Sequence, residues 1–300
     1  MDDKKTVVIT GANSGLGFEC AQNIAHNTEY CIILACRDTM KAEQAKADLI
    51  QISGNPHIEA MELDVSSFAS IRAFVSKYKE LNLPLYGLVC NAGINGTNIG
   101  KTSDGFDIVF ETNHLGHFLL TNLLLPSMLP SGRIAVVSSD MHDPPGAELT
   151  WPGTAAIAGP DETLEGNFVR YSYSKLCNLY FTYELSARLI RIGAGIIINA
   201  FNPGLMIDTG FAPDKSRFTE SFLQQVSDRI GSLEKSALAL SQIITDPYLA
   251  RATGKYFDRG IEEKRSSSLS YDMENALELW NTSAAYAKLT RGETLQGLLY

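Results

Sequence analysis

Tyr171 and Lys175 are the residues of this chain whose types and spacing most clearly suggest chemistry. They lie four positions apart in a segment that is predicted to be helical, so both side chains leave the same face of the helix. A lysine ammonium beside a phenol favours the phenolate, which lowers the pKa of the tyrosine. Such a tyrosine can donate or accept a proton near neutral pH. Tyr173 lies only two positions from Lys175 and points elsewhere, so geometry favours Tyr171.

A phosphate-binding turn is predicted near the N-terminus. Residues 6–10 form an apolar, β-branched run typical of a buried strand, and residues 18–27 are predicted to be helical. The turn between them contains Gly11, Asn13, Ser14, Gly15, Leu16 and Gly17. Glycines let the backbone approach a pyrophosphate, and free N–H groups at the helix start meet its negative charge. A plain tight turn is the alternative, but the strand before and the helix after favour phosphate binding.

The rest of the chain alternates predicted strands and helices. Strands are expected at 31–36, 58–63, 85–91, 133–138, 196–201 and 255–257, and helices at 40–52, 67–81, 108–125 and 171–192. This alternation predicts a Rossmann-type, doubly wound α/β domain with a mostly parallel seven-stranded sheet and helices on both faces. Catalytic groups should gather at the carboxyl ends of the strands, where Asn91, Ser139 and Pro203 are expected.

Composition favours a single intracellular domain. With 300 residues and 45% hydrophobic content, the chain can bury one sizeable core, so one domain over residues 1–300 is predicted. The net charge of −9 argues against a nucleic-acid partner. No apolar run is long enough to span a bilayer, and the first strand begins too early for a signal peptide. Five cysteines without a C-x-x-C pair indicate buried thiols in a reducing compartment, so a cytoplasmic location is expected.

Together, these motifs resemble those of the short-chain dehydrogenase/reductase family, from Thr10 to about Leu289. The resemblance identifies a cofactor turn at Gly11, Gly15 and Gly17, an adenine-contacting pair at Asp64 and Val65, a motif after the fourth strand at Asn91, Ala92 and Gly93, and a turn beside the nicotinamide at Pro203 and Gly204. It identifies the catalytic tetrad as Asn113, Ser139, Tyr171 and Lys175, with Ser138 as a structural neighbour. Every motif occurs in the family's order.

The resemblance implies hydride transfer between NADP(H) and the carbonyl or alcohol group of a small apolar molecule. Ser139 would hydrogen-bond the carbonyl oxygen and Tyr171 would protonate it. Lys175 would depress the pKa of the tyrosine and hold the nicotinamide ribose. Asn113 would anchor a water relay that returns the proton.

Several segments resemble one branch of the family, that of retinol dehydrogenases and light-dependent protochlorophyllide reductases. They are residues 112–120, 174–178, 280–283 and 203–209, with Thr209 six positions after Pro203. Leu205 and Ser139 stand where the pigment reductase typically has cysteine and threonine, and its lysine-rich segment before the tyrosine is not seen. Ordinary carbonyl chemistry is therefore favoured. Light-driven double-bond reduction and a non-catalytic NADP-binding sensor are the alternatives, although a sensor would not need all four tetrad residues.

The end of the second predicted strand indicates the cofactor. A site that prefers NAD usually has an acidic residue there to bind the ribose 2′-hydroxyl. This chain has Cys36 followed by Arg37, a planar and permanent cation suited to a 2′-phosphate, and Lys41 could add to it. The sequence therefore predicts NADP(H). The alternative is a solvated Arg37 paired with Asp38.

Two segments are predicted to control access and assembly. Residues 205–230, with Phe211, Phe218 and Phe222, are expected to form an apolar substrate lid rather than plain core. An insertion at 142–169 is rich in Gly, Pro and Ala, with Trp151 and Leu164 as apolar anchors, and is predicted to be an irregular loop. It leads into the catalytic helix, whose outer face commonly makes the family's dimer contact. A monomer is therefore predicted, and a dimer that uses the loop is the alternative.

Three further features receive structural interpretations. His114 and His117 flank Asn113 and are expected to pack rather than to bind a metal, because a metal site needs more ligands; no metal is predicted. Residues 262–265 are expected to be a solvated loop. Residues 277–289 are expected to form a helix that covers the core.

Overall fold

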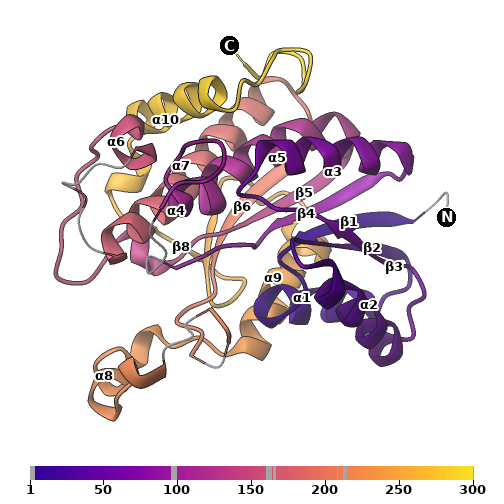
Figure 1. Cartoon of the computed structure of the whole chain (residues 1–300), viewed down its shortest axis with the longest axis horizontal. Helices are drawn as coiled ribbons and strands as arrows, with labels where there is room; N and C mark the ends of the chain where they lie inside the picture. The colour runs from indigo at the N-terminus through magenta and orange to yellow at the C-terminus, as the bar shows by residue number, and fades with distance from the viewer. Residues whose placement is uncertain are drawn as a thin grey trace.

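A single eight-stranded sheet forms the centre of the computed structural model, which describes residues 4–95, 100–159, 164, 167–207, 209–211 and 215–299. The strand order is β3-β2-β1-β4-β5-β6-β7-β8 (Figure 1). The strands are β1 (Lys5–Thr10), β2 (Tyr30–Cys36), β3 (Ile58–Glu62), β4 (Leu85–Cys90), β5 (Met128–Val137), β6 (Ile197–Asn202), β7 (Tyr256–Asp258) and β8 (Glu263–Lys264). All neighbours pair in parallel except β7 and β8.

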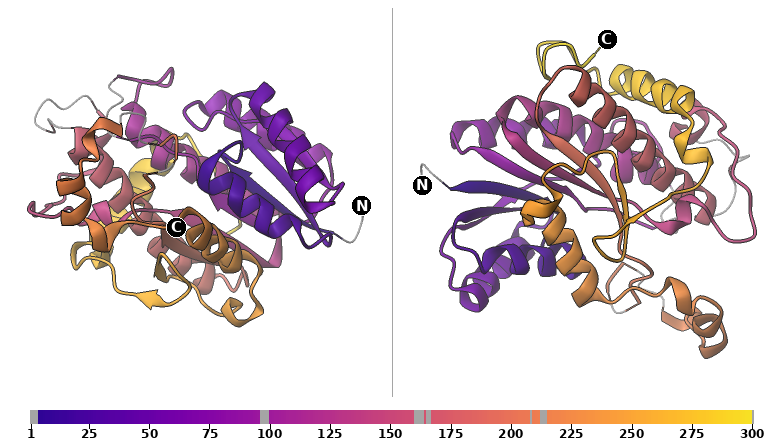
Figure 2. Two further views of the ribbon diagram at one scale, coloured as in Figure 1. Left: turned by 90° about the horizontal axis from the view of Figure 1, so that it is seen from below. Right: turned by 180° about the vertical axis from the view of Figure 1, so that it is seen from behind.

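Helices cover both faces of the sheet (Figures 1 and 2). One layer holds α1 (Gly15–Ala25), α2 (Thr39–Ser53) and α9 (Leu233–Thr245), and the other holds α3 (Phe68–Glu80), α5 (Gly116–Leu124) and α7 (Asn167–Arg191). Alternate residues of β1 face the two layers: Val7 and Ile9 pack in the first core, and Val8 packs in the second. This double burial explains why the sequences of β1 and β2 in the middle of the sheet are continuous apolar runs. The predicted α/β architecture is confirmed.

The order of the strands reverses at β1. It lies between β2 on one side and β4 on the other, and Thr10 pairs with Ala35 while Ile9 pairs with Val89. In doubly wound sheets a ligand crevice opens at this reversal, beyond the carboxyl ends of the strands. The predicted site residues are located at this edge.

The sheet has one strand more than predicted. β8 is a two-residue antiparallel strand, with both residues exposed, in the segment expected to be a solvated loop. It forms because the chain turns back after β7 and pairs with it: Tyr256 with Lys264 and Phe257 with Glu263. So short an edge strand carries no hydrophobic pattern that could reveal it.

The predicted helix at 108–125 is interrupted. The structure has α4 (Ile108–Phe110), a π-helical segment η1 (Glu111–Leu115) and then α5. The helix begins at Asp107, whose carboxylate accepts the backbone N–H groups of Val109 and Phe110. π-helical segments inside helices often mark functional sites.

The insertion at 142–169 is not wholly irregular, so that prediction was wrong in part. It follows a short turn, η3 (Asp140–His142), and contains α6 (Thr154–Ala158); residues 160–163, 165 and 166 lie outside the described residues. The α6 sequence is rich in alanine, the best helix former. Glu278 also accepts hydrogen bonds from the N and Oγ1 atoms of Thr154, at 3.2 and 2.8 Å, which anchors the helix start.

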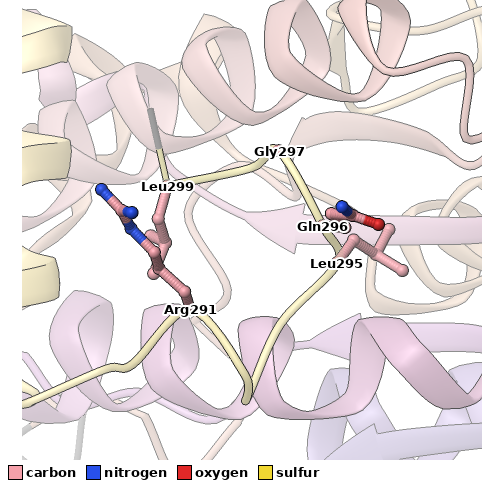
Figure 3. Close-up of a pocket in the computed structure, with 5 residues that line it drawn as sticks. All are labelled: Arg291, Leu295, Gln296, Gly297 and Leu299. Atoms are coloured by element: carbon pink, nitrogen blue, oxygen red, sulfur yellow. The ribbon is translucent and has the colours of Figure 1, made fainter.

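The C-terminal helix α10 (Met273–Tyr286) packs against α7, as predicted for a helix that covers the core. Trp280 is buried between Phe118 of α5 and Phe181 of α7. A cavity of about 40 Å³ lies in the tail beyond α10, lined by Arg291, Leu295, Gln296, Gly297 and Leu299 (Figure 3). Its volume is of the order of one water molecule, so it offers no room for a cofactor.

The described residues contain no helix that combines the length and the apolar composition needed to cross a bilayer.

Candidate active site

The glycine turn joins β1 directly to α1. Its φ angles are +64° at Gly11 and +55° at Gly15. A Cβ on Gly17 would lie 2.6 Å from Nδ2 of Asn91, so the close packing of helix and strand requires glycine there. Ser14 is the N-cap residue of α1, but its side chain makes no capping hydrogen bond. The first N–H groups of α1 are thus left for an anion, and the turn fits a dinucleotide pyrophosphate.

Hydrogen bonds fix the end of β4 to the same turn. The Oγ1 atom of Thr10 accepts from the backbone N–H groups of Asn91 and Ala92, each at 2.9 Å. The Asn91 side chain donates in return to the carbonyl oxygen of Thr10, at 2.8 Å. A Cβ on Gly93 would lie 3.1 Å from Oδ1 of Asn113 and 3.8 Å from Nζ of Lys175. This motif therefore runs from the phosphate turn to two of the predicted catalytic residues.

Tyr171 and Lys175 lie side by side on α7. The Nζ atom of Lys175 is 5.4 Å from the centroid of the Tyr171 ring and donates to the carbonyl oxygen of Val137, at 3.0 Å. Tyr173, by contrast, is buried away from them and donates to the carbonyl oxygen of Thr150 in the insertion. The choice of Tyr171 over Tyr173 rests on this divergence.

Ser139 lies at the carboxyl end of β5 and faces Tyr171. Burial raises the pKa of Tyr171, and the neighbouring Ser139 side chain lowers that pKa by a smaller amount. The Oγ atom of Ser139 also donates to Oδ1 of Asp140, at 3.2 Å. Ser138 instead binds the carbonyl oxygen of Lys175, at 2.8 Å, and so joins β5 to α7.

Asn113 is buried in the π-helical segment η1, and its side chain is fully engaged. Its Oδ1 atom accepts from the backbone N–H of Ile94, and its Nδ2 atom donates to the Ile94 carbonyl oxygen and to Oγ of Ser174. Asn113 therefore positions backbone rather than offering free side-chain atoms to a ligand.

The remaining predicted cofactor contacts lie on both sides of this centre. After β6, the Gly204 N–H donates to Oδ1 of Asn202. Further along, Thr209 lies 3.6 Å from where a Cβ on Gly15 would be, so the segment from Gly204 to Thr209 reaches the glycine turn. On the far side of β1, Asp64 accepts two hydrogen bonds from Ser66. Val65 is buried beside α5.

Arg37 is exposed directly after β2, next to the glycine turn. In the described part of the chain it makes no ion pair, because Asp38 is the N-cap of α2 and binds Lys41 instead. The Gly11 N–H donates to the carbonyl oxygen of Ala35, at 2.9 Å, and so brings the end of β2 against the turn. The alternative Arg37–Asp38 pair is therefore not formed.

Comparisons with known proteins agree with this geometry. The family model described as short chain dehydrogenase matches residues 5–151. Retinol dehydrogenase 13 of Homo sapiens is 37% identical over 292 residues, which cover 93% of this chain and 83% of that protein. The chain belongs to the short-chain dehydrogenase family. It is thus an oxidoreductase of the class that interconverts alcohols and carbonyls with a nicotinamide cofactor, and the predicted family is confirmed.

Other relatives of this short-chain dehydrogenase differ in length. The chloroplastic short-chain dehydrogenase TIC 32 B of Brassica napus is 33% identical over 93% of this chain and 87% of its own. The WW domain-containing oxidoreductase of Gallus gallus is 38% identical over 211 residues. These residues cover 68% of this chain but only 49% of that protein. A crystal structure of an uncharacterized protein from Mycobacterium Paratuberculosis has a TM-score of 0.73 at 30% identity, over 95% of this chain and 93% of that one.

The pKa of Tyr171 in this short-chain dehydrogenase differs from the predicted direction. Burial raises it, whereas the sequence predicted that Lys175 would lower it. Two features account for the difference. Burial lowers the pKa of Lys175 itself to about 7, so its charge is partly lost at neutral pH. Its Nζ atom also donates to Val137 rather than to the phenol.

His117 links the glycine turn to η1, a connection that sequence reasoning missed. Its Nε2 atom lies 2.9 Å from Oγ1 of Thr10, and its Nδ1 atom lies 3.3 Å from the main-chain oxygen of Asn113. Burial lowers the pKa of His117 to about 4, so the ring is neutral and makes one donor and one acceptor contact. No sequence spacing connects Thr10 with His117, since they are 107 positions apart.

His114 packs away from the site, among Phe110, Phe118 and Phe181. Its Nε2 atom lies 3.0 Å from Oγ of Ser283. Within the described ranges, no three His, Cys, Asp or Glu side chains gather in a way that could hold a metal ion.

Proposed function

We propose that this short-chain dehydrogenase is an NADPH-dependent reductase of apolar carbonyl compounds, with Tyr171 as the general acid. The observation that carries the proposal is that three side chains converge next to the predicted nicotinamide turn. Ser139 lies at the carboxyl end of β5, and Tyr171 and Lys175 lie in the first turns of α7. The reverse reaction oxidises the alcohol.

Tyr171 and Ser139 divide the work at the carbonyl oxygen. In the reductive direction an acid must hold its proton until transfer, and burial keeps Tyr171 protonated by raising its pKa. Ser139 would donate its hydroxyl proton in a hydrogen bond to the carbonyl oxygen of the substrate, and its position beside Tyr171 favours the phenolate that the transfer leaves behind. Lys175, with its pKa near 7, can then supply a proton at neutral pH. Because the side chain of Asn113 is engaged, a relay water would bind its main-chain oxygen.

The bound cofactor supplies the hydride, and this chain supplies its position. The proposed contacts are Gly11, Asn13, Ser14, Gly15, Leu16 and Gly17 for the pyrophosphate, Arg37 for the 2′-phosphate, Asp64 and Val65 for the adenine, and Asn91, Ala92, Gly93, Tyr171, Lys175, Pro203, Gly204 and Thr209 for the nicotinamide half. Arg37 has no ion pair with any residue that the structure describes, and this supports NADPH over NADH.

An apolar substrate follows from the segment over the tyrosine. The Phe211 ring lies 5.9 Å from the Tyr171 ring, and Phe218 and Phe222 contact each other further along. Phe211 and Phe222 are partly exposed, and α8 (Glu220–Gln225) buries none of its residues and projects from the body (Figures 1 and 2). We therefore assign residues 205–230 as the substrate lid; residues 208 and 212–214 lie outside the described residues.

A cofactor-consumption screen tests the function. Purified protein would be incubated in the dark with NADPH and panels of ketones, aldehydes, retinoids and quinones, with Tyr171→Phe as the matched inactive control. Consumption that requires both a carbonyl and Tyr171 is expected. Turnover that occurs only under illumination, or NADPH binding without turnover on any panel, would contradict the proposal.

The location that we propose is cytoplasmic. All five cysteines are free and buried, which fits a reducing compartment.

A further inference from the structure

The two ends of the lid leave the body of the protein together. The Leu205 N–H donates to the carbonyl oxygen of Arg229, at 2.8 Å, and the Gly231 N–H donates back to the Leu205 oxygen, at 3.1 Å. Leu205 also follows directly after the predicted nicotinamide turn. The backbone of Arg229 is therefore held at the base of the lid, whatever the outer part of the lid does.

The side chain of Arg229 reaches from this base to the residue beside the catalytic serine. Its Nε atom donates to Oδ2 of Asp140, at 2.6 Å, and the two side chains are only 19% and 25% exposed. The other carboxylate oxygen, Oδ1, accepts the hydroxyl of Ser139, at 3.2 Å. An unbroken series of polar contacts thus runs from the lid through Asp140 to Ser139.

The charges that face Asp140 come from several elements. Arg259, after β7, contributes positive charge but is itself bound to Asp258 and to the Asp228 carbonyl oxygen. His142, in the same turn, has its pKa lowered by burial and is neutral, while Tyr256 and Tyr171 face Asp140 from β7 and α7. Lys175 lies beyond Tyr171. In the described part of the chain, Arg229 is the cation bonded directly to Asp140.

We propose that Arg229 is a positioning residue for the reaction, which acts through Asp140 to release the Ser139 hydroxyl for the substrate and to cancel a negative charge beside Tyr171. This inference rests on the proposed function. Without Arg229, the full charge of Asp140 would draw the Ser139 proton away from a substrate carbonyl. The same charge disfavours the phenolate of Tyr171 and raises its pKa.

Four variants test the proposal with a substrate from the carbonyl screen: Arg229→Met, Arg229→Lys, Asp140→Asn and the Arg229→Met/Asp140→Asn double variant. We expect Arg229→Met to lower kcat on the order of tenfold, the size of one charge-assisted hydrogen bond. Alcohol oxidation requires Tyr171 to lose its proton, so the rise of its rate with pH should move upward by about one pH unit. Asp140→Asn should restore both quantities in the double variant, and Arg229→Lys should restore them in part.

Arg259→Met is the matched control, because it removes another cation that holds the base of the lid. If Arg229 only ordered the lid, Asp140→Asn would rescue neither Arg229→Met nor, when it is combined with that control, Arg259→Met. A double variant as slow as Arg229→Met, or an unshifted pH profile, therefore overturns the inference.

A second measurement needs no substrate. The Arg229 and Asp140 variants form a double-mutant cycle in denaturant unfolding, and coupling of at least about twofold in the unfolding equilibrium constant is expected. If the wild type reduces no carbonyl, the proposed function fails, and the cycle still decides whether the contact between lid and Asp140 exists in solution. Absence of coupling overturns the inference on its own.

Discussion

Tyr171 and Tyr173 are two positions apart on α7, and their side chains face different surroundings. Tyr171 faces Ser139, Lys175 and the lid, whereas the hydroxyl of Tyr173 bonds the Thr150 carbonyl oxygen at 2.8 Å. Positions two apart on a helix leave in different directions. Substitution of either ring by phenylalanine preserves packing, so the pair separates catalysis from structure.

Tyr171→Phe should reduce turnover by at least about 100-fold, because general acid catalysis contributes roughly 10²–10⁴-fold. NADPH should still bind, since the ring and its packing remain. Tyr173→Phe is the control: it loses a buried hydrogen bond worth about 1 kcal/mol of stability but keeps its turnover. Steady-state kinetics and cofactor titration measure both. The assignment is wrong if Tyr173→Phe is the inactive variant.

Arg37→Ala should weaken NADPH binding about ten- to a hundred-fold, because a charge-assisted contact is worth roughly 1.5–3 kcal/mol. NADH binding should not change, since NADH lacks the 2′-phosphate. The Asp38 cap of α2 remains in place, so the helix start is not disturbed. Lys41→Ala is the matched control, with a smaller expected loss because Lys41 is paired with Asp38. Fluorescence titration decides, and equal affinities of the unmutated protein for the two cofactors would sink this prediction.

At the level of elements, contacts between distant segments create the features that local patterns do not show. The predicted strands lie within one residue of the observed ones, except that β5 begins five residues earlier, at Met128. Most of them are buried apolar runs between turn residues, which the sequence shows directly. The motif residues follow the strand ends and therefore meet at one edge. The π-helical segment has no such signature, since all its residues are buried. Likewise, α6 depends on Glu278, 124 positions from Thr154.

Gly116, where α5 begins, is a sharp test of element packing. A Cβ there would lie well inside contact distance of the Val65 carbonyl oxygen, which is backbone and cannot rotate away. Gly116→Ala should therefore destabilise the protein by about 1–3 kcal/mol, as overpacking does. It should also weaken cofactor binding, because Val65 belongs to the predicted adenine pair.

Gly292→Ala provides the control for Gly116→Ala, because a Cβ at Gly292 meets nothing within 4 Å. Denaturant unfolding and NADPH titration would be compared for the two variants. Equal stability of both would show that α5 can move away from Val65 without cost.

At the scale of the whole molecule, the outer side of α7 is covered by the chain itself. The helix α10 packs along it, and Glu278 of α10 holds the insertion through Trp151 and Thr154 (Figure 1). The family resemblance predicts a dimer contact at this face. Because α10 and the insertion occupy it, a dimer contact there would have to displace them, and the monomer stays a prediction.

Light scattering should therefore give a mass near 32.8 kDa, the mass of one chain. Glu278→Ala removes the carboxylate that anchors Trp151 and Thr154, so it should loosen the insertion and raise the average mass at high concentration. A wild-type mass of about 66 kDa, twice the 32.8 kDa chain, would refute the monomer and favour a dimer that uses the insertion.

The paired ends of the lid have a consequence for engineering. Leu205 and Ile230 form a β-bridge, so the segment between them is a loop whose two ends are held together. Its length can change at little cost to the rest of the fold, since doubling a flexible loop costs only about 0.6 kcal/mol in closure entropy. The segment can therefore be replaced by the corresponding segment of a relative while the sheet stays unchanged. Since we propose that this segment is the substrate lid, we expect grafts that end before Arg229 to alter the choice of substrate and to leave the proton chemistry in place.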